Sequence, residues 1–580
     1  MSRESPSAPG EEAAPEHPAM KKLINAPGAV VPEMLAGLTV AYPNLRKLPG
    51  QNVLARADID PNRHDRVALI SGGGSGHEPA HAGYVGRGML SAAVAGDVFT
   101  SPPPDAVLAA IRAVTGPRGC LLIVKNYTGD RLNFGLAAER ARAEGLAVEM
   151  VLVADDVALA DAAGHAGRRG LAGTILVHKV AGAAAEAGLS LAEVAAEARA
   201  VASEVRTMGV ALAPCTVPAA GEPGFSLGEG EIEMGLGIHG EPGLARVPLA
   251  PADTLVDDIL GRLVPPREHA AGRPVALMVN GLGGTPAMEL AIVARRAVET
   301  LEGWGLAVER VYLGNFLTAL EMAGVSLTLL PVMPERIGRL DSPTSAPAWP
   351  ASPGRPRERA AEPATPVETG APPRPSAPAT EAGRALGAAL SRVAEALLAA
   401  EPALTAADSV VGDGDLGISL ARGARAILEA LPTLPLDDPS AAARSLGVAL
   451  EHSLGGTSGP LYAAFLARAS AALARDANDW ASALRDGCSA VSDLGGAHPG
   501  DRTMLDALGP ASDALSVAMG AGLPGAEALH RAVEAARAGA RATADMRPRL
   551  GRSSYLADRA LGHPDPGAEA VAVWLGAIPA

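Results

Sequence analysis

The first half of the chain alternates short apolar runs with longer segments that repeat at helical spacing. The apolar runs predict buried strands at 67–71, 120–125, 147–153, 274–279 and 308–313. Ala-rich segments at 103–114, 131–144 and 285–302 separate these runs and predict helices. This alternation favours an α/β architecture with a largely parallel sheet. A glycine-rich stretch of weaker strands at 224–243 interrupts the pattern, so we expect two α/β subdomains.

The second half of the chain shows helical spacing almost throughout. Its Ala-, Leu- and Arg-rich segments have almost no β-branched runs, and they lie near 381–400, 418–430, 440–453, 460–475, 511–519 and 526–544. We therefore predict an all-α domain. Between the halves, Pro343–Pro378 contains 11 prolines in 36 residues, a density that predicts an extended linker. The predicted organisation is a disordered tail at 1–19, a domain at 20–340, the linker at 341–379 and a helical domain at 380–580.

Composition narrows the classes of function. An apolar fraction of 48% is too high for a chain disordered throughout. A net charge of −15 and only 15 aromatic rings give no reason to bind a nucleic acid, which needs basic patches or stacking platforms. An acidic protein that handles a phosphorylated ligand would need metal ions.

Cysteine usage and the absence of long apolar stretches bear on location. Cys120, Cys215 and Cys488 are far apart in sequence, which suggests neither a zinc site nor a disulfide framework. No apolar stretch reaches the length of a membrane helix, and four glutamates occupy residues 1–19, where a secretory signal would need an apolar run. We expect a cytoplasmic protein with no membrane partner.

Two predicted strand ends carry candidate chemistry. The turn SGGGSGHEP (71–79) lacks the Gly-Lys-Ser/Thr of a Walker loop and fits the dinucleotide fingerprint poorly. Its glycines could bring backbone amides close to a small polar ligand, or they could serve only a tight turn. In KNYTGDRLNF (125–134), Lys125 ends a strand and Asp130 begins a helix, either as a functional carboxylate or as a helix cap. Together with His77, these two residues would face one crevice.

A third motif, GLGIHGEPG (235–243), places His239 among glycines, so its imidazole must project from an accessible backbone. A neutral histidine there could be a nucleophile, a hydrogen-bond donor or a metal ligand. Metal binding is the least favoured of these because no Cys or His partner stands at ligand spacing. A plain surface histidine remains an alternative.

The helical half holds an acidic motif, ADSVVGDGDLG (407–417), with Asp408, Asp413 and Asp415. Such hard oxygen ligands suit Mg²⁺ that is shared with nucleotide phosphates. A Ca²⁺ loop would need a glutamate that is missing here, and a solvated acidic turn is the other alternative.

GGTSGP (455–460) offers hydroxyls and amides at a helix start, which suits phosphate. GDRTMLDAL (500–508), GRSSYL (551–556) and DPGA (565–568) are loop-to-helix junctions that could close a nucleotide pocket.

In their order along the chain, these eight motifs resemble those of the dihydroxyacetone kinases. The resemblance covers about 20–340 and 380–580. It implies an α/β substrate domain followed by a nucleotide domain built as an eight-helix barrel, with phosphoryl transfer where the two domains meet.

The resemblance also implies roles for individual residues. His239 would attack the carbonyl of dihydroxyacetone to form a covalent hemiaminal, while His77 and Asp130 would assist proton removal from the attacking hydroxyl. The residues around the substrate would be Gly74, Ser75, Gly76, His77, Lys125 and Asp130. Asp408, Asp413 and Asp415 would hold two Mg²⁺ ions on ATP. The nucleotide would contact Leu416, Gly417, Thr457, Ser458, Gly495, Thr503, Met504, Arg552, Asp565, Pro566 and Gly567. Leu416 departs from the small or polar residue that the family more often has.

The expected function is therefore ATP-dependent phosphorylation of dihydroxyacetone or a closely related short ketose or triose. Fusion of both domains in one chain favours ATP over a phosphoprotein donor, and it leads us to expect a homodimer. A lyase that splits FAD into AMP and cyclic FMN is an alternative on the same nucleotide domain. A sugar-binding regulator is disfavoured because GDGD and His239 are both present.

Overall fold

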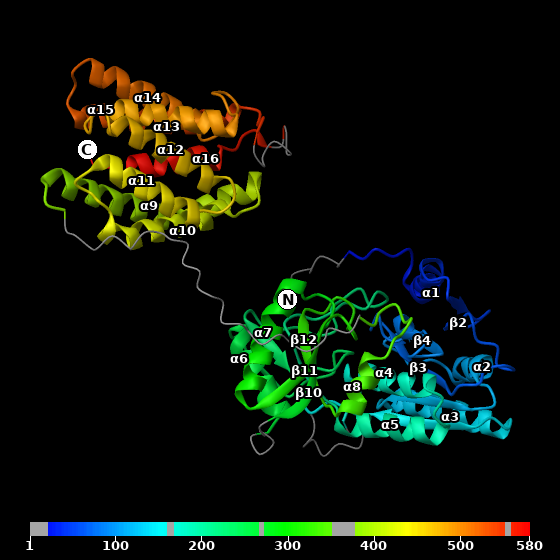
Figure 1. Cartoon of the computed structure of the whole chain (residues 1–580). Helices are drawn as coiled ribbons and strands as arrows, with labels where there is room; N and C mark the ends of the chain where they lie inside the picture. The colour runs from blue at the N-terminus through cyan, green and yellow to red at the C-terminus, as the bar shows by residue number, and fades with distance from the viewer. Residues whose placement is uncertain are drawn as a thin grey trace, which may run out of the picture. The chain divides into compact units, whose positions relative to one another are not determined.

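The computed structural model describes residues 21–158, 168–265, 272–350, 378–550, 558 and 560–579. The chain divides into two compact units, Met1–Ala360 and Ala361–Ala580 (Figure 1). Within the described residues, all strands belong to the first unit and the second unit is helical. The predicted fold class, an α/β region followed by an all-α region, is confirmed.

The first unit begins with a sheet of six strands among the described residues, in the order β1-β2-β4-β3-β5-β6. Their bounds are β1 (Leu45–Lys47), β2 (Val53–Arg56), β3 (Ala68–Ser75), β4 (Ala92–Val98), β5 (Cys120–Lys125) and β6 (Val148–Val153). β4, β3, β5 and β6 pair in parallel. The loops that follow β3 and β5 therefore meet at one edge of the sheet, where open α/β sheets bind ligands.

Helices cover both faces of this sheet, which explains why its central strands are continuously apolar. Along β3, Leu69 packs with α1 (Val30–Ala41), α4 (Gly173–Glu186) and α5 (Leu191–Glu204). The next residue, Ile70, packs on the opposite face with α2 (Pro104–Val114) and α3 (Thr128–Ala143). The strands and helices predicted in this region therefore form as expected.

The second sheet has six strands in the described part of the chain, in the order β11-β10-β12-β7-β8-β9. They are β7 (Arg206–Ala211), β8 (Glu231–Met234), β9 (Ala245–Pro248), β10 (Arg273–Gly281), β11 (Leu306–Gly314) and β12 (Gly324–Pro331). Only β10 and β11 pair in parallel. The prediction of a largely parallel sheet is wrong here, because the sequence pattern did not identify β7 and β12. The helices α6 (Ala252–Leu263) and α7 (Ala287–Gly303) pack on this sheet.

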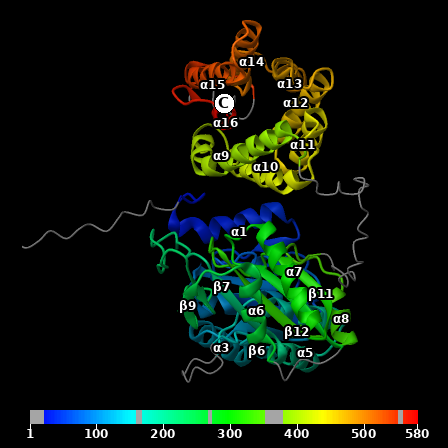
Figure 2. The same ribbon diagram turned by 90° about the vertical axis from the view of Figure 1, so that its left-hand side faces the viewer.

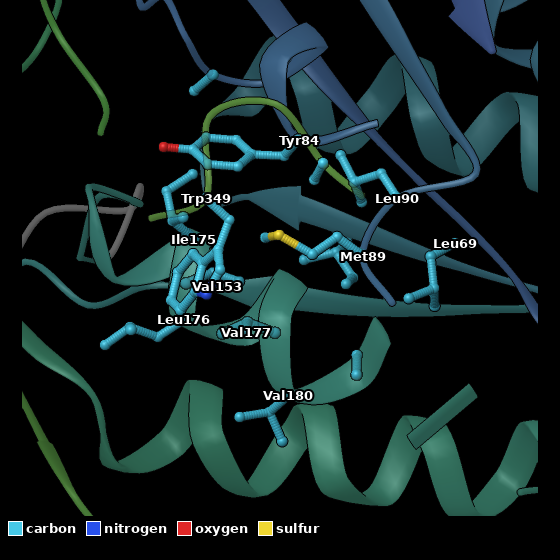
Figure 3. Close-up of a cluster of buried hydrophobic side chains, with 14 of the residues drawn as sticks. Leu69, Tyr84, Met89, Leu90, Val153, Ile175, Leu176, Val177, Val180 and Trp349 are labelled. Carbon is cyan, nitrogen blue, oxygen red and sulfur yellow. The ribbon is translucent and has the colours of Figure 1, made fainter. Parts of the chain in front are cut away.

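Residues 343–350, predicted as the start of the linker, instead pack against the first unit after α8 (Pro334–Asp341). Trp349 is only 8% exposed and belongs to the same apolar cluster as Tyr84 and Leu176 (Figure 3). The Lys179 ammonium donates hydrogen bonds to two backbone carbonyls at the end of α8, at 2.8 and 2.7 Å. Proline density alone placed the boundary too early, because the buried ring of Trp349 anchors this segment.

The second unit contains eight α-helices within its described residues. They are α9 (Glu381–Val411), α10 (Leu416–Ala430), α11 (Pro439–Ser453), α12 (Ser458–Leu473), α13 (Trp480–Gly495), α14 (Leu505–Gly520), α15 (Gly525–Ala542) and α16 (Pro566–Gly576). Each helix packs against the next, and α16 packs against α9, which closes a ring (Figure 2). The sequence pattern missed α13 and α16 and ended α9 too early. None of the helices in the described ranges is long and apolar enough to span a bilayer.

Candidate active site

The turn after β3 carries His77 into the interior of the first unit, where its side chain is fully buried. Its Nδ1 lies 2.7 Å from the carbonyl oxygen of Thr318. A carbonyl can only accept a hydrogen bond, so Nδ1 carries a proton. Burial and the positive charge of Lys125 hold the pKa of His77 well below its ordinary value, so a lone pair remains on Nε2.

His239 comes from the other sheet, in the loop after β8. Its Nδ1 lies 2.8 Å from Oε1 of Glu241, and its backbone N–H donates to Oε2 of the same carboxylate at 3.0 Å. Burial raises the pKa of Glu241, but the hydrogen bond and charge of His239 outweigh it and hold the pKa at about 2. Because Glu241 is ionised, Nδ1 of His239 must be the donor, and its Nε2 is left to face the crevice.

The two imidazoles meet at these remaining nitrogens. Nε2 of His77 lies 3.0 Å from Nε2 of His239. A hydrogen bond at this distance needs a proton on one of the two Nε2 atoms, and Nε2 of His239 can attack only while that proton lies on His77. The His239 side chain is 18% exposed, so a small ligand can reach it. The pair can therefore deliver a proton to a carbonyl oxygen while Nε2 of His239 attacks the carbonyl carbon.

Two aromatic rings hold this imidazole pair. Phe99 stacks on His77 with ring centroids 5.1 Å apart, and it meets His239 edge-on at 5.3 Å. Tyr127 meets His239 edge-on at 4.7 Å. Phe99 adopts a φ of 57°, and a Cβ at Gly76 would lie 2.9 Å from its ring. The glycine is therefore needed for the ring of Phe99 to approach His77.

Lys125 and Asp130 face the same crevice from β5 and α3. A Cβ at Gly73 would lie 3.2 Å from Nζ of Lys125 and 3.3 Å from Oδ2 of Asp130, so both groups approach the same point. The Lys125 side chain is fully buried, and its ammonium has no hydrogen-bond partner among the described residues. Burial lowers the pKa of Lys125, while the charge of Asp130 opposes that change. A buried ammonium in this state suits a ligand hydroxyl.

The alternative role of Asp130 as a helix cap is not what the structure describes. At the described start of α3, the N-cap residue is Tyr127 and no side chain makes a capping hydrogen bond. Asp130 instead lies in the first turn, where its carboxylate accepts a hydrogen bond from the hydroxyl of Ser101. The side chain is thereby turned toward the loop after β4 and the crevice.

Gly74, Ser75 and Gly76 line the turn mainly by their shape. The Ser75 hydroxyl donates to the carbonyl of Gly96 at 2.7 Å, and the N–H of Gly76 donates to Glu78 at 2.9 Å. A Cβ at Gly74 would lie 2.6 Å from the backbone nitrogen of Thr100. These residues allow close packing around the crevice, and two of their donors already have partners.

In the helical unit, the acidic motif folds into a compact cluster. Ligand oxygens of Asp408, Asp413 and Asp415 all lie within 4.8 Å of one another. Asp408, near the end of α9, accepts the backbone N–H groups of Asp415 and Leu416 at 3.0 and 3.2 Å. Asp413 and Asp415 are exposed. Three carboxylates this close repel one another unless a cation neutralises them, and the all-oxygen donor set fits Mg²⁺.

The other predicted nucleotide residues lie at helix starts. The starts of α10 and α12 lie close together, where the N–H of Gly455 donates to the hydroxyl of Ser419 at 2.8 Å, and so do the starts of α14 and α16, where Nη1 of Arg502 lies 4.0 Å from Oδ1 of Asp565. The residues at these starts are Leu416, Gly417, Thr457, Ser458, Thr503, Met504, Asp565, Pro566 and Gly567, and Gly495 ends α13. Helix starts present unpaired N–H groups and positive dipole ends, which favour phosphate. Arg552 lies outside the described residues.

The sequence interpretation missed several residues of the first-unit crevice. Glu241 stands two residues after His239 in the quoted motif, and Tyr127 stands two residues after Lys125. Either could have been found by asking which side chains flank the candidate groups. Phe99 and Thr318 approach the imidazoles from distant loops, and no local pattern marks them.

Comparison with known proteins connects this geometry to a family. Two family models match, one described as Dak1 domain at residues 36–348 and one as DAK2 domain at residues 410–580. A tomato (Solanum lycopersicum) protein named putative 3,4-dihydroxy-2-butanone kinase is 49% identical, over 96% of this chain and 97% of its own. A human protein named triokinase/FMN cyclase is 46% identical, over 96% of this chain and 98% of its own. The crystal structure of the dihydroxyacetone kinase from C. freundii in complex with AMP-PNP and Mg²⁺ is 38% identical and covers 96% of this chain and 99% of its own, with a TM-score of 0.61.

Proposed function

The chain belongs to the dihydroxyacetone kinase family, and we propose that it transfers the γ-phosphate of ATP to dihydroxyacetone or a closely related short ketose or triose. The observation that carries this proposal is the pair of His77 and His239, whose Nε2 atoms lie 3.0 Å apart. A nucleophilic nitrogen beside a transferable proton selects a carbonyl compound over a simple polyol. The complex of the C. freundii enzyme with AMP-PNP and Mg²⁺ supports ATP as the donor.

The first step is covalent capture of the ketone. Nε2 of His239 forms a bond to the carbonyl carbon, and the carbonyl π electrons move to the oxygen. The proton between the two imidazoles goes to that oxygen, which becomes the hydroxyl of a hemiaminal. The ring of His239 keeps the positive charge that the pair carried before, and the Glu241 carboxylate on Nδ1 stabilises it.

The second step is attack of a substrate hydroxyl on the γ-phosphorus, which breaks the bond to the β-phosphate oxygen and releases ADP. The C–N bond of the hemiaminal then breaks, its hydroxyl proton returns to the imidazole pair, and the phosphorylated ketone leaves. The Lys125 ammonium orients the captured molecule through its hydroxyls, and Asp130, with His77, accepts the proton that the attacking hydroxyl loses. Asp408, Asp413 and Asp415 would hold two Mg²⁺ ions, which would neutralise charge on the phosphates of ATP. Thr457 and Ser458 present the start of α12 to the phosphates.

The experiment measures ATP consumption together with product mass. The substrates are dihydroxyacetone, D-glyceraldehyde, both erythrulose enantiomers and glycerol, and the variants are His239→Ala and Asp413→Ala. We expect a phosphorylated carbonyl compound that is missing in both variants, and no phosphorylation of glycerol. No ATP-dependent product from any carbonyl substrate would refute the proposal and would point to a phosphoprotein donor or to FAD cleavage.

A second proposal concerns the helical unit alone. The human relative, 46% identical, carries the name triokinase/FMN cyclase, which supports cleavage of FAD to AMP and cyclic FMN here as well. The ribityl 4′-hydroxyl of FAD bonds to the phosphorus already carried by the 5′-oxygen, the pyrophosphate P–O bond breaks, and AMP leaves with the hydroxyl proton, so no other reactant is needed. We expect FAD turnover to require Asp413 and to survive His239→Ala; cyclic FMN formation that depends on His239 would contradict this assignment.

We also propose that the protein is a cytoplasmic homodimer. Cys120, Cys215 and Cys488 all lie within the described ranges and are unpaired thiols, which supports a reducing compartment. The dimer rests on the fusion of both domains in one chain, which leaves them free to exchange between two subunits. Light scattering tests it, and a monomer at micromolar concentration would contradict it.

A further inference from the structure

We call residues 235–242, the loop that carries His239, the nucleophile loop. A residue from a connection between elements of the first sheet holds this loop in place. Arg169 stands between β6 and α4, and its side chain is only 9% exposed. Its Nη2 donates to the carbonyl oxygen of Gly235 at 2.7 Å. Its Nη1 reaches the carbonyl oxygens of Glu241 and the next residue at 3.5 and 3.4 Å. One guanidinium thus holds both ends of the nucleophile loop.

Arg169 is in turn fixed by Asp156, which follows β6. Its Nε donates to Oδ2 of Asp156 at 2.7 Å, and the backbone N–H of Asp156 donates to the carbonyl of Arg169 at 3.0 Å. The other carboxylate oxygen accepts the N–H of Ala158 at 2.9 Å. The Asp156 side chain is 1% exposed. Burial raises the pKa of Asp156, and the guanidinium opposes that rise. A buried pair of this kind persists only when its hydrogen bonds are satisfied, as these are.

The packing at Gly237 places this guanidinium beside the carboxylate that holds the nucleophile. A Cβ at Gly237 would lie 2.5 Å from Nη1 of Arg169 and 2.0 Å from Oε2 of Glu241. Both side chains therefore pack against the same backbone position, and only glycine leaves room for them. The position of the Glu241 carboxylate, and through it the orientation of the His239 ring, depends on where Arg169 holds the loop.

We propose that Arg169 is a positioning residue for covalent capture: it holds the nucleophile loop, which connects β8 and β9 of the second sheet, against the connection that follows β6 of the first sheet, so that Nε2 of His239 meets the carbonyl carbon. This inference rests on the proposed function. Lys cannot replace Arg169, because an ammonium cannot bond to Asp156 and to carbonyls at both ends of the loop through a planar fork. A displacement of about 1 Å at the reacting nitrogen lowers a rate about 100-fold.

The test compares Arg169→Lys and Arg169→Ala with a matched control, Arg310→Lys. Arg310 forms a comparable pair with Asp341 in the same unit, at 2.9 and 2.5 Å, and bonds no atom of the nucleophile loop. Hemiaminal is measured by ¹³C NMR of dihydroxyacetone labelled at the carbonyl carbon, and kcat by ATP consumption. We expect both Arg169 variants to lose most of the hemiaminal signal and about 100-fold in kcat, with the KM for ATP unchanged. Guanidinium ion in the buffer should partly restore hemiaminal to Arg169→Ala and have no such effect on His239→Ala.

The outcomes separate this inference from the function on which it rests. If the unaltered protein forms no hemiaminal, both the proposed function and the role of Arg169 are overturned. Hemiaminal in the unaltered protein and equally in Arg169→Lys, with kcat unchanged per folded molecule, overturns the role of Arg169 alone. Equal losses in Arg310→Lys also overturn it, because the effect is then one of stability.

Discussion

The carboxylate of Glu241 decides which nitrogen of His239 is free to react. With a pKa of about 2 it stays ionised, so it keeps the proton on Nδ1 and leaves Nε2 toward the crevice. The same charge stabilises the ring once it carries a positive charge. In the proposed mechanism, one side chain thus supplies both orientation and charge stabilisation to the attacking imidazole.

Replacing Glu241 with Gln tests that role, because the amide keeps the shape and removes the charge. We expect kcat to fall by about 10²–10⁴-fold, the range found when a carboxylate that orients a catalytic imidazole is lost. The measurements are kcat and the ¹³C hemiaminal signal. Glu229→Gln alters an exposed carboxylate of the same unit and is the control. Full activity in Glu241→Gln would show that the ring needs no fixed charge.

The pH dependence should report on Lys125, whose ammonium we place on the substrate hydroxyls. Burial lowers the pKa of Lys125, so kcat/KM should fall on the alkaline side at a pH below the ordinary lysine value. The negative charges that oppose this change are those of Asp130, Glu241, Asp155 and Glu78. Glu78→Gln removes one of them, so the pKa of Lys125 should drop further and the alkaline limb should move to lower pH.

The measurement is kcat/KM for dihydroxyacetone across the alkaline range, compared between the unaltered protein and Glu78→Gln. Glu139→Gln, on the exposed side of α3, is the control and should leave the limb in place. A limb that moves to higher pH in Glu78→Gln, or equally in both variants, would show that another group titrates.

At the scale of single residues, the sequence could bring together only part of the site. His77, Lys125 and Asp130 follow two neighbouring parallel strands, so strand order alone predicted their shared crevice. His239 comes from the second sheet, and its 3.0 Å contact with His77 depends on how the sheets pack. From the sequence alone, Glu241 in its glycine-rich loop looks like an ordinary solvent-exposed carboxylate. The positive φ of Phe99 is set by its surroundings and leaves no mark on the local pattern.

Among the helices, α16 has a largely buried carboxyl group at its N-cap, and burial destabilises the ionised form of this group. Asp565 is its N-cap and accepts the N–H of Ala568 at 2.9 Å. Burial raises the pKa of Asp565 to about 6. Because the folded pKa lies above the unfolded one, the folded state binds an extra proton between the two values. As the pH rises through that window, Asp565 loses this proton and the free energy of unfolding of the helical unit decreases. The decrease is complete above pH 6.

Asp565→Asn keeps a capping oxygen and removes the charge. We expect it to stabilise the helical unit by up to about 3 kcal/mol at pH 8, and the difference from the unaltered protein should shrink as the pH falls toward 4. Urea unfolding at several pH values measures it. A constant difference at every pH would mean that the carboxyl does not titrate in the window. If Asp565 also contacts the nucleotide, the same variant should bind AMP-PNP and Mg²⁺ more weakly.

Three of the elements that the sequence patterns missed, β7, β12 and α13, share a physical cause. β7 and β12 contain Thr, Ser and Gly among their apolar residues, so they do not read as apolar runs, although both faces of these strands are covered. α13 buries small residues, among them Ala481, Ala483 and Gly487, instead of a leucine stripe. In both cases tertiary packing supplies burial that the local pattern does not advertise.

At the scale of the whole molecule, each unit has its own hydrophobic interior. In the described ranges, every apolar cluster is confined to one unit: four clusters belong to the strand-containing unit and four to the helical ring. Covalent capture of the ketone is assigned to side chains of the first unit only, and Mg²⁺ and nucleotide binding to the second only. The two half-reactions should therefore be separable by mutation, although phosphorylation requires both.

We expect His239→Ala to lose the hemiaminal and to bind AMP-PNP with Mg²⁺ as well as the unaltered protein does. Asp413→Ala should show the reverse, because removing one of three clustered carboxylates weakens the metal site and leaves the other unit's core untouched. The ¹³C signal of labelled dihydroxyacetone measures the first half-reaction and calorimetric titration measures the second, with Asp513→Ala on the exposed side of α14 as control. Loss of the hemiaminal in Asp413→Ala would mean that the metal site affects ketone capture in the other unit. Ketone capture in the first unit would then be coupled to metal binding in the second, and the two half-reactions would not be separable by mutation.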